Sequence, residues 1–364
     1  MKKLEYITIL RALAILAVLV VHVKQVSDGM AYIHPYIISI ADNGARGVQL
    51  FYLLSAFTLF HSFNYRTAKE KRPKTNYFVR RFFRIAPLYY LAIIYYLWQD
   101  GTGPRYFLGD AKNISAANVV SNFTFLHGFG PYWITSLVPG GWSIAVETTF
   151  YCFLPFLFLK IKTRQQAFNF VVITLGIRLV FLLFLTHYRM IPDQRLWHEY
   201  LFLYLPNQLP YFSLGIFLYF LIYDKTSTQI SSKSFLTAAI ILLFGCSIRG
   251  DLLIPDIFGF GIAFLFLALT LHKYHPRILF NGPFLYIGEI SYTLYLTHFA
   301  AIHFLTRYGI INLLINYNEP LAIINFLLNY GLVLTVAVLL STILYYTIEQ
   351  PMQKFGGRLI RKYS

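Results

Sequence analysis

Arg11 and His22 are ionisable residues inside the first apolar run of this 364-residue chain. An ionisable side chain at membrane depth is costly and is therefore a candidate for function. Their separation of eleven positions corresponds, in an α-helix, to about 20° more than three full turns and a rise of roughly 16 Å, so both lie on one face. His22 could accept a proton from a hydroxyl; the alternative is an interfacial histidine with a snorkelling arginine.

Ser143 and Glu147 form a second group, within the run GGWSIAVETTFYCFLPF. Their spacing of four predicts that they share one helical face. A carboxylate in this apolar setting must meet a cation or remain protonated, and in either state it can serve as the partner of an imidazole. The structural alternative is an ion pair with a buried arginine, for which Arg178 is available.

Arg80, Arg81 and Arg84 form a third group, in the basic and aromatic stretch NYFVRRFFRIAPLYY. Arginine binds phosphate groups through two parallel hydrogen bonds, so this stretch could hold a phosphate-rich ligand. A membrane-surface helix in contact with anionic lipid is the alternative.

Ser291, Tyr292, Tyr295 and His298 form a fourth group, in GEISYTLYLTHF. Tyrosine and histidine are common at membrane interfaces, so packing is the alternative to chemistry here. We find no Cys and His spacing typical of a zinc site and no glycine-rich phosphate loop, so we expect no metal.

The composition predicts the elements that must position these groups. The chain is 57% hydrophobic and only 13% charged, with a mean hydropathy of +0.56, whereas soluble domains carry about 25% charged residues. We therefore expect an all-α, polytopic transmembrane helix bundle of about ten spans, with nine and eleven as alternatives. The expected spans are residues 6–23, 44–63, 85–98, 142–159, 167–186, 200–223, 235–248, 254–271, 287–306 and 321–347.

The distribution of basic residues predicts the orientation. With ten spans, most Lys and Arg residues fall on the side of the N-terminus, which places both termini in the cytoplasm. Arg11 interrupts the first apolar run and no small-residue cleavage site follows, so we expect an uncleaved first span. The net charge of +16 is then explained by basic residues on the cytoplasmic side of the membrane, where they contact anionic lipids. We therefore expect no nucleic-acid partner. We expect a multi-pass protein of the inner (plasma) membrane.

Six motifs in order along the chain resemble the membrane-bound acyltransferase-3 family, whose members O-acylate glycans and some lipids or small molecules. The hallmark is a basic residue, ten residues and a histidine, matched by Arg11 and His22. The other motifs are FYLLSAF around Ser55, RRxxRIxP at Arg80, Arg81, Arg84 and Pro87, WSxxxE at Trp142, Ser143 and Glu147, SYxLYLxH ending at His298, and ExP at Glu349 and Pro351. Ala56 stands where the family usually has glycine.

The resemblance implies an O-acyltransferase (EC 2.3.1.-), most simply an O-acetyltransferase, that uses cytoplasmic acyl-CoA as donor substrate and binds no resident cofactor. The acceptor would be a hydroxyl of a cell-surface or exported glycan, such as exopolysaccharide or lipopolysaccharide, or a lipid-linked sugar. It also implies an acyltransferase-3 transmembrane domain over residues 1–350 and a short basic cytoplasmic tail over 351–364, without the esterase-like domain that some members carry.

The resemblance also assigns roles to single residues. His22 is the expected general base, Glu147 orients it or stabilises its charge, and Ser143 is a hydrogen-bonding neighbour. The residues expected to bind acyl-CoA are Arg11, Arg80, Arg81 and Arg84, and the residues expected to support the site are Ser55, Tyr292, Tyr295 and His298.

Several alternatives stay open at this point. The transfer can be direct or can pass through an acyl-enzyme intermediate, and the acyl group can be acetyl or longer. The main rival function is a proton-coupled transporter or flippase of a glycan or small molecule, in which the same charges form a proton relay. We find no inverted repeat that favours it. A third possibility is a non-catalytic scaffold protein, but that function would not explain the ionisable residues within the apolar runs.

Overall fold

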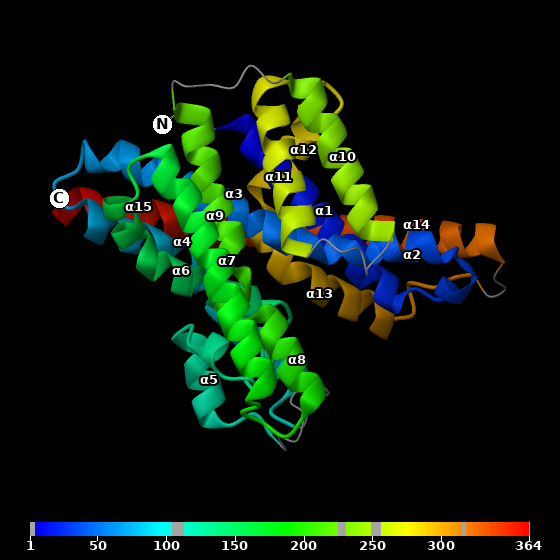
Figure 1. The fold of residues 1–364 in the computed structure, drawn as a ribbon. Helices are drawn as coiled ribbons and strands as arrows, with labels where there is room; N and C mark the ends of the chain where they lie inside the picture. The colour runs from blue at the N-terminus through cyan, green and yellow to red at the C-terminus, as the bar shows by residue number, and fades with distance from the viewer. Residues whose placement is uncertain (1–3, 104–112, 225–230, 249–255, 315–317, 364) are drawn as a thin grey trace. The chain divides into compact units, whose positions relative to one another are not determined.

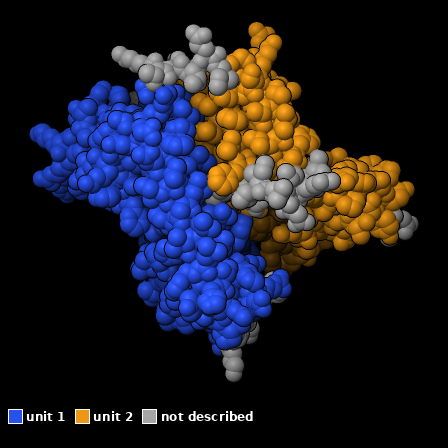
Figure 2. All heavy atoms as spheres, viewed as in Figure 1, with its two compact units in different colours: residues 1, 55–225, 346–364 blue, residues 2–54, 226–345 orange. Residues whose placement is uncertain are grey.

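A computed structural model describes residues 4–103, 113–224, 231–248, 256–314 and 318–363, and every element in these ranges is helical (Figure 1). The expected all-α class is therefore confirmed. The chain divides into two compact units that each combine distant parts of the sequence (Figure 2). Unit 1 comprises residues 1, 55–225 and 346–364, and unit 2 comprises residues 2–54 and 226–345.

Unit 1 holds the basic stretch and Glu147. Its described helices are the second part of α3 (Gly47–Thr67), α4 (Pro73–Asp100), α5 (Ala116–Phe123), the 3-10 helix η4 (His127–Phe129), α6 (Gly141–Lys160), α7 (Arg164–His187), α8 (Gln194–Leu203), α9 (Leu205–Tyr223) and α15 (Gln350–Tyr363). Within the unit, α9 packs against α6 and α7, and α15 packs against α4. The α4–α15 contact is close, because a Cβ added at Gly356 would lie 2.9 Å from side-chain atoms of Phe83.

Unit 2 holds Arg11, His22 and His298. Its described helices are α1 (Glu5–Val26), η1 (Met30–Tyr32), α2 (Pro35–Asp42), η2 (Asn43–Arg46), the first part of α3, α10 (Ser232–Ile248), α11 (Asp256–Lys273), α12 (Gly282–Glu289), α13 (Ser291–Arg307) and α14 (Glu319–Leu344). A π-helical segment, Tyr345–Glu349, follows α14, and its residues from Tyr346 onward belong to unit 1. Helix α1 contacts α12, α13 and α14. At Gly288 an added Cβ would lie 1.9 Å from the carbonyl oxygen of Thr8, so only glycine permits this approach of α12 to α1.

An asparagine cluster fixes the C-terminal end of α1 in unit 2. Asn312 has a left-handed backbone with φ of 59°, and its side-chain oxygen accepts hydrogen bonds from Asn329 at 2.7 Å, the Asp28 amide at 3.0 Å and Asn325 at 3.1 Å. Its side-chain nitrogen donates to the carbonyl oxygen of Val26 at 2.8 Å. Asparagine tolerates left-handed backbone better than most residues, so one side chain satisfies several groups at this turn.

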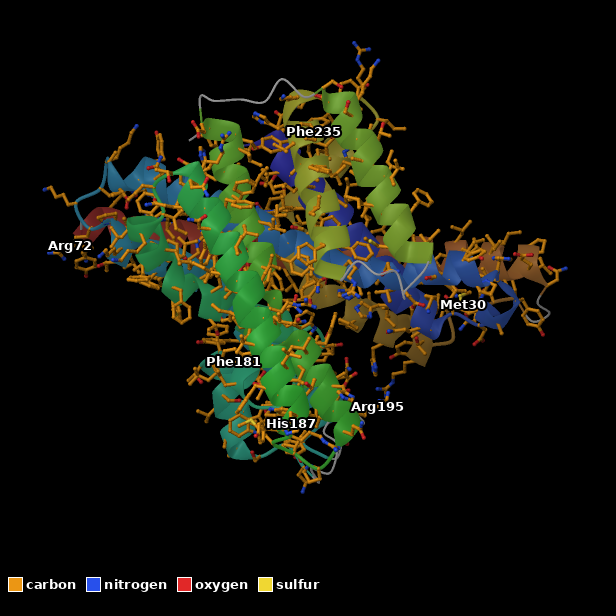
Figure 3. The ribbon with its side chains drawn as sticks, viewed as in Figure 1. Met30, Arg72, Phe181, His187, Arg195 and Phe235 are labelled. Carbon is orange, nitrogen blue, oxygen red and sulfur yellow. The ribbon has the colours of Figure 1, made fainter. Side chains whose placement is uncertain are left out.

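The apolar helices support a membrane protein but do not establish the expected number of spans. Within the described residues, five helical stretches are long and apolar enough to cross a membrane, beginning at Glu5, Gly141, Arg164, Gln194 and Glu319, and two shorter apolar helices accompany them. The stretch from Gln194 comprises α8 and α9, and the stretch from Glu319 comprises α14, the segment Tyr345–Glu349 and α15. Helix α7 is the clearest case, because large apolar side chains such as Val180 and Leu183 are 63% exposed (Figure 3 labels Phe181 and His187). The ten spans and the cytoplasmic termini stay predictions.

Several expected spans have different boundaries in the structure. The expected span 200–223 is interrupted at Tyr204, between α8 and α9, where Pro206 stands at the start of α9. The expected span 287–306 is likewise interrupted at Ile290, between α12 and α13. Residues 73–98, by contrast, belong to one helix, α4, so the basic stretch and the apolar run after it are continuous. Proline and short turns, rather than hydropathy, decide these boundaries.

Candidate functional site

Glu147 is held by two hydroxyl groups of unit 1. Ser55 of α3 and Tyr151 of α6 both donate hydrogen bonds to its Oε1 atom. The two hydroxyl oxygens are themselves 3.1 Å apart, and the hydroxyl of Tyr77 in α4 donates to the carbonyl oxygen of Tyr151 at 3.2 Å. This cluster joins α3, α4 and α6 around one carboxylate, and it places Ser55, expected only as a supporting residue, in direct contact with Glu147.

The two other polar residues considered near Glu147 have different partners. The Ser143 hydroxyl donates to the carbonyl oxygen of Gly140 at 2.9 Å, in the first turn of α6. Nε of Arg178 donates to Oδ1 of Asn207 at 2.7 Å. No ion pair joins Arg178 to Glu147 among the described residues, so this form of the structural alternative is absent there.

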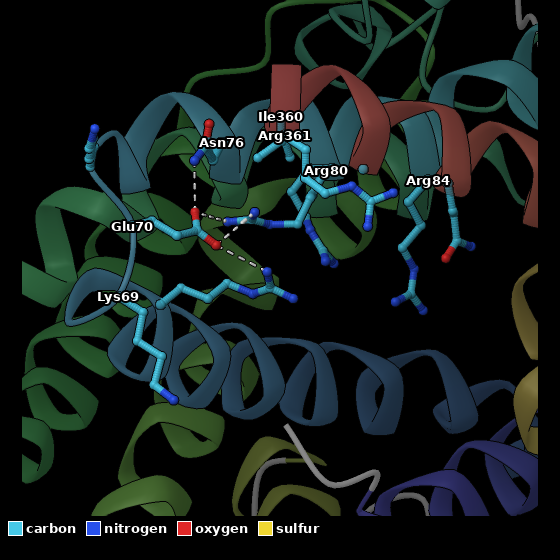
Figure 4. Close-up of a pocket in the computed structure, with 12 residues that line it drawn as sticks. Lys69, Glu70, Asn76, Arg80, Arg84, Ile360 and Arg361 are labelled. Atoms are coloured by element: carbon cyan, nitrogen blue, oxygen red, sulfur yellow. Dashed lines mark hydrogen bonds and ion pairs between the residues drawn. The ribbon is translucent and has the colours of Figure 1, made fainter. Parts of the chain in front are cut away.

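A basic pocket opens beside this cluster in unit 1, with a volume of about 660 Å³ (Figure 4). We call it the basic pocket throughout; its lining residues are Arg66, Lys69, Glu70, Lys71, Asn76, Arg80, Arg81, Arg84, Gln353, Gly357, Ile360 and Arg361. Five arginines and two lysines thus face one glutamate. All three arginines expected from the basic stretch are present.

Glu70 organises one side of the basic pocket. Arg80 donates to both carboxylate oxygens of Glu70 at 3.1 Å, Arg66 donates to one of them at 3.1 Å, and Asn76 donates at 2.9 Å. Burial alone would raise the pKa of Glu70, but these hydrogen bonds and the charge of Arg80 outweigh it and lower the pKa below its usual value. Figure 4 shows these bonds as dashed lines, with Arg84 apart from them.

Arg81 links the basic pocket to the Glu147 cluster. It lines the pocket, and its guanidinium group interacts electrostatically with Glu147, Tyr151 and Tyr77. Its Nε atom is buried and has no hydrogen-bond partner among the described residues. A buried donor without a partner is costly, so this group is suited to a ligand that brings an acceptor.

His22 lies near the C-terminal end of α1 in unit 2. Its Nδ1 atom is 3.1 Å from Oε1 of Gln25, one turn further along the helix. Its ring centroid is 4.4 Å from that of Phe299 and 5.3 Å from that of His298. In the tautomer that donates from Nδ1 to the Gln25 amide oxygen, Nε2 keeps the lone pair that a general base needs.

His298 is fully buried beside His22. Its Nδ1 atom lies 3.2 Å from the carbonyl oxygen of Leu294, and its Nε2 atom has no hydrogen-bond partner within the described part of the chain. The ring of Tyr295 is 5.9 Å from that of His298, while Tyr292 is half-buried at the start of α13. Of the four residues in this motif, the structure thus brings His298 closest to His22.

Arg11 and His22 occupy the single helix α1, as the spacing predicts, and both are half-buried. They belong to unit 2, whereas Glu147, Arg80, Arg81 and Arg84 belong to unit 1. The expected pairing of Glu147 with His22 and the expected joint binding of acyl-CoA by Arg11 and the basic stretch therefore stay predictions.

Sequence reasoning did not single out four residues of these clusters. Tyr151 stands one turn after Glu147, and Gln25 stands three residues after His22, so helical spacing could have indicated both. Glu70 follows Arg66 by four residues, which is a common ion-pair spacing. Arg361 belongs to the segment expected as a basic tail, and only its folding as α15 brings it to the basic pocket.

Comparison with known proteins agrees with the motifs. A family model described as an acyltransferase domain, of the acyltransferase-3 type, matches residues 4–346. Two relatives from Staphylococcus aureus, strains COL and MSSA476, each bear the name "Putative O-acetyltransferase" and are each 25% identical to this chain. The matches cover 98% and 95% of this chain but only 58% and 57% of the relatives, so the chain spans less than two thirds of their length. No solved structure matches the chain.

The family match thus covers the helices of both units, from α1, which carries the Arg11 and His22 motif, to the end of α14. The chain belongs to the acyltransferase-3 family.

Proposed function

We propose that this protein is an integral-membrane O-acyltransferase that moves an acyl group from cytoplasmic acyl-CoA to a hydroxyl of a cell-surface or exported glycan. The observation that carries the proposal is the basic pocket, because an acyltransferase needs a donor and CoA carries three phosphate groups. A pocket of about 660 Å³ lies within the size range of small-molecule sites. Arg81 and Arg84 bind phosphate directly, Arg80 adds the charge of a guanidinium group held by Glu70, and Arg11 binds the pantetheine end.

The transfer is direct in this proposal. Nε2 of His22 takes the proton of the acceptor hydroxyl as its oxygen attacks the thioester carbonyl carbon. The C–O bond forms, the C–S bond breaks, and the proton passes to the CoA thiolate, which leaves as the thiol. A positioned general base contributes about 10² to 10⁴ in rate. Acetyl is the simplest acyl group, since the relatives are named as O-acetyltransferases.

The test uses sealed inside-out vesicles that contain the full-length protein and radiolabelled acetyl-CoA. Wild-type vesicles should release CoA and transfer label to glycan in alkali-labile form, whereas His22→Ala should lower the rate about 10²-fold or more. His34→Ala is the matched control, because His34 is exposed at the start of α2. Glycan movement across the membrane without CoA release would instead identify a transporter, and full activity of His22→Ala would exclude it as the base.

A further inference from the structure

The wall of the basic pocket is completed by α15, a helix that lies outside the acyltransferase-3 match over residues 4–346. This helix contributes Gln353, Gly357, Ile360 and Arg361 to the lining. Its position against α4 is fixed by Phe355, whose ring centroid is 5.3 Å from that of Phe83, and by Gly356. Because α15 packs against α4, Arg361 lines the same pocket as Arg84.

The cations of the basic pocket are not equivalent. Arg66 and Arg80 share the single carboxylate of Glu70 in ion pairs at 3.1 Å, which offsets one of their two positive charges. Arg84 and Arg361, in contrast, form no ion pair with any of the described carboxylates. Two uncompensated guanidinium groups on two helices are suited to bind one polyanion, because each can make two parallel hydrogen bonds to a phosphate.

We propose that α15 is part of the donor site and that Arg361 binds a phosphate group of the acyl-CoA donor together with Arg84. This inference rests on the proposed function and extends it, because it adds a phosphate-binding residue, Arg361, from a helix that the family match does not include. Arg80, whose guanidinium group Glu70 holds, adds positive charge to the same pocket. The shared chemistry is that of a phosphate group, which either CoA or an anionic lipid headgroup can supply.

The experiment measures CoA binding to the purified full-length protein in nanodiscs of phosphatidylcholine. Arg361→Gln should weaken CoA binding about tenfold or more, which is the usual effect of removing hydrogen bonds to a charged group. Arg358→Gln is the matched control, because Arg358 is an exposed arginine of α15, as Arg361 is, but does not line the pocket. Its affinity for CoA should equal that of the wild type.

A steric variant tests the same wall without changing charge. An added Cβ at Gly357 would meet no atom within 4 Å, and Gly357 lines the pocket, so Gly357→Met places a larger side chain at the pocket wall. We expect this variant to weaken CoA binding while its thermal unfolding temperature stays the same or rises, because methionine has a higher helix propensity than glycine. A temperature matching the wild type also shows that Arg361→Gln is folded.

The outcomes separate this inference from the proposed function. If the wild type binds CoA and both Arg361→Gln and Gly357→Met bind it equally well, α15 is not part of the donor site, although the donor assignment stands. If the wild type binds no CoA, the donor assignment itself is wrong. In nanodiscs that also contain phosphatidylglycerol, an unchanged effect of Arg361→Gln supports the donor site. Loss of the effect there, with the lipid displacing CoA, identifies Arg361 as a lipid ligand and overturns the inference.

Discussion

Glu147 illustrates at the scale of one residue how this protein keeps a carboxylate among apolar helices. The side chain is only half-buried, yet it receives hydrogen bonds from Ser55 and Tyr151. Hydrogen bonds to a charged group are worth about twice as much as those between neutral groups. The three residues come from α3 and α6, so the carboxylate also fixes the relation between these helices.

Tyr151→Phe should therefore lower the free energy of unfolding by about 1 kcal/mol or more, because it removes one of the two hydrogen-bond donors of the Glu147 carboxyl group. Tyr204→Phe is the matched control, since the buried Tyr204 hydroxyl has no partner among the described residues. Its removal should leave stability unchanged or slightly higher. Thermal or denaturant unfolding of both variants in the same detergent provides the measurement. Equal losses in the two variants would contradict the role of the Tyr151 hydroxyl.

The helix α1 shows, at the scale of elements, how the position of His22 is determined. Its two ends are held by different contacts of unit 2. Near the N-terminal end, Gly288 of α12 lies against the carbonyl of Thr8, and at the C-terminal end the asparagine cluster around Asn312 holds the backbone of Val26. Between them, the hydroxyl of Tyr330 donates to the carbonyl oxygen of Leu16 at 3.1 Å.

Gly288→Ala should destabilise the protein by about 1 to 3 kcal/mol, because the new Cβ overlaps backbone that must shift. Gly331→Ala in α14 offers a comparison within the same unit, since an added Cβ there meets nothing within 4 Å. That change should be neutral or stabilising by up to about 1 kcal/mol, owing to the higher helix propensity of alanine. Unfolding curves of the two variants provide the measurement. If Gly288→Ala leaves the stability unchanged, α12 is able to move away from α1 and the close contact is not required.

The asparagine cluster leads to a separate prediction for the rate of the proposed acyl transfer. Asn312→Ala removes the acceptor shared by Asp28, Asn325 and Asn329, and alanine also tolerates the left-handed backbone poorly. We expect a loss of about 2 kcal/mol or more in stability and a fall in the rate of acyl transfer, because the end of α1 next to His22 loses its anchor. Asn43→Ala, which removes one bond to the carbonyl oxygen of Ser39, should have a smaller effect.

At the scale of the whole molecule, the packing of helices from distant parts of the chain is the property that the sequence predicts least. Hydropathy predicts the helical class, and the motifs at His22, Glu147 and Arg84 predict the family, because each depends on local residues. The division into two units is different: each unit joins segments far apart in the chain, and α3 contributes to both. The periodicity of hydrophobic residues along the sequence does not indicate which distant helices pack together. For the same reason, the approach of Arg361 to the basic pocket could not be predicted, whereas the helical spacing of Tyr151 and Glu147 could.

The stability of the whole protein should depend on pH through His127. This residue lies outside the expected spans, and its burial lowers its pKa to about 4, although hydrogen bonds to backbone carbonyls oppose that shift. Since the unfolded chain binds a proton near pH 6.5, the folded state is at full stability above that pH and loses stability as pH falls toward 4. The loss should approach about 3 kcal/mol.

Unfolding measured between pH 7 and pH 4 checks this dependence. His127→Gln should flatten the profile over that interval, even if it lowers stability at neutral pH. His34→Gln, a change at an exposed histidine, should leave the slope unaltered. A profile with the same slope in His127→Gln and in the wild type would assign the acid sensitivity to other groups.

The participation of α15 in the basic pocket also bears on biosynthesis. Ribosomes would deliver α4 long before α15, and at about 5 to 20 residues per second the interval is roughly tens of seconds. During that time Arg84 has no α15 beside it, and the pocket lacks one wall. The proposed donor site would therefore be complete only after residues 350–363 have been synthesised and α15 has packed against α4.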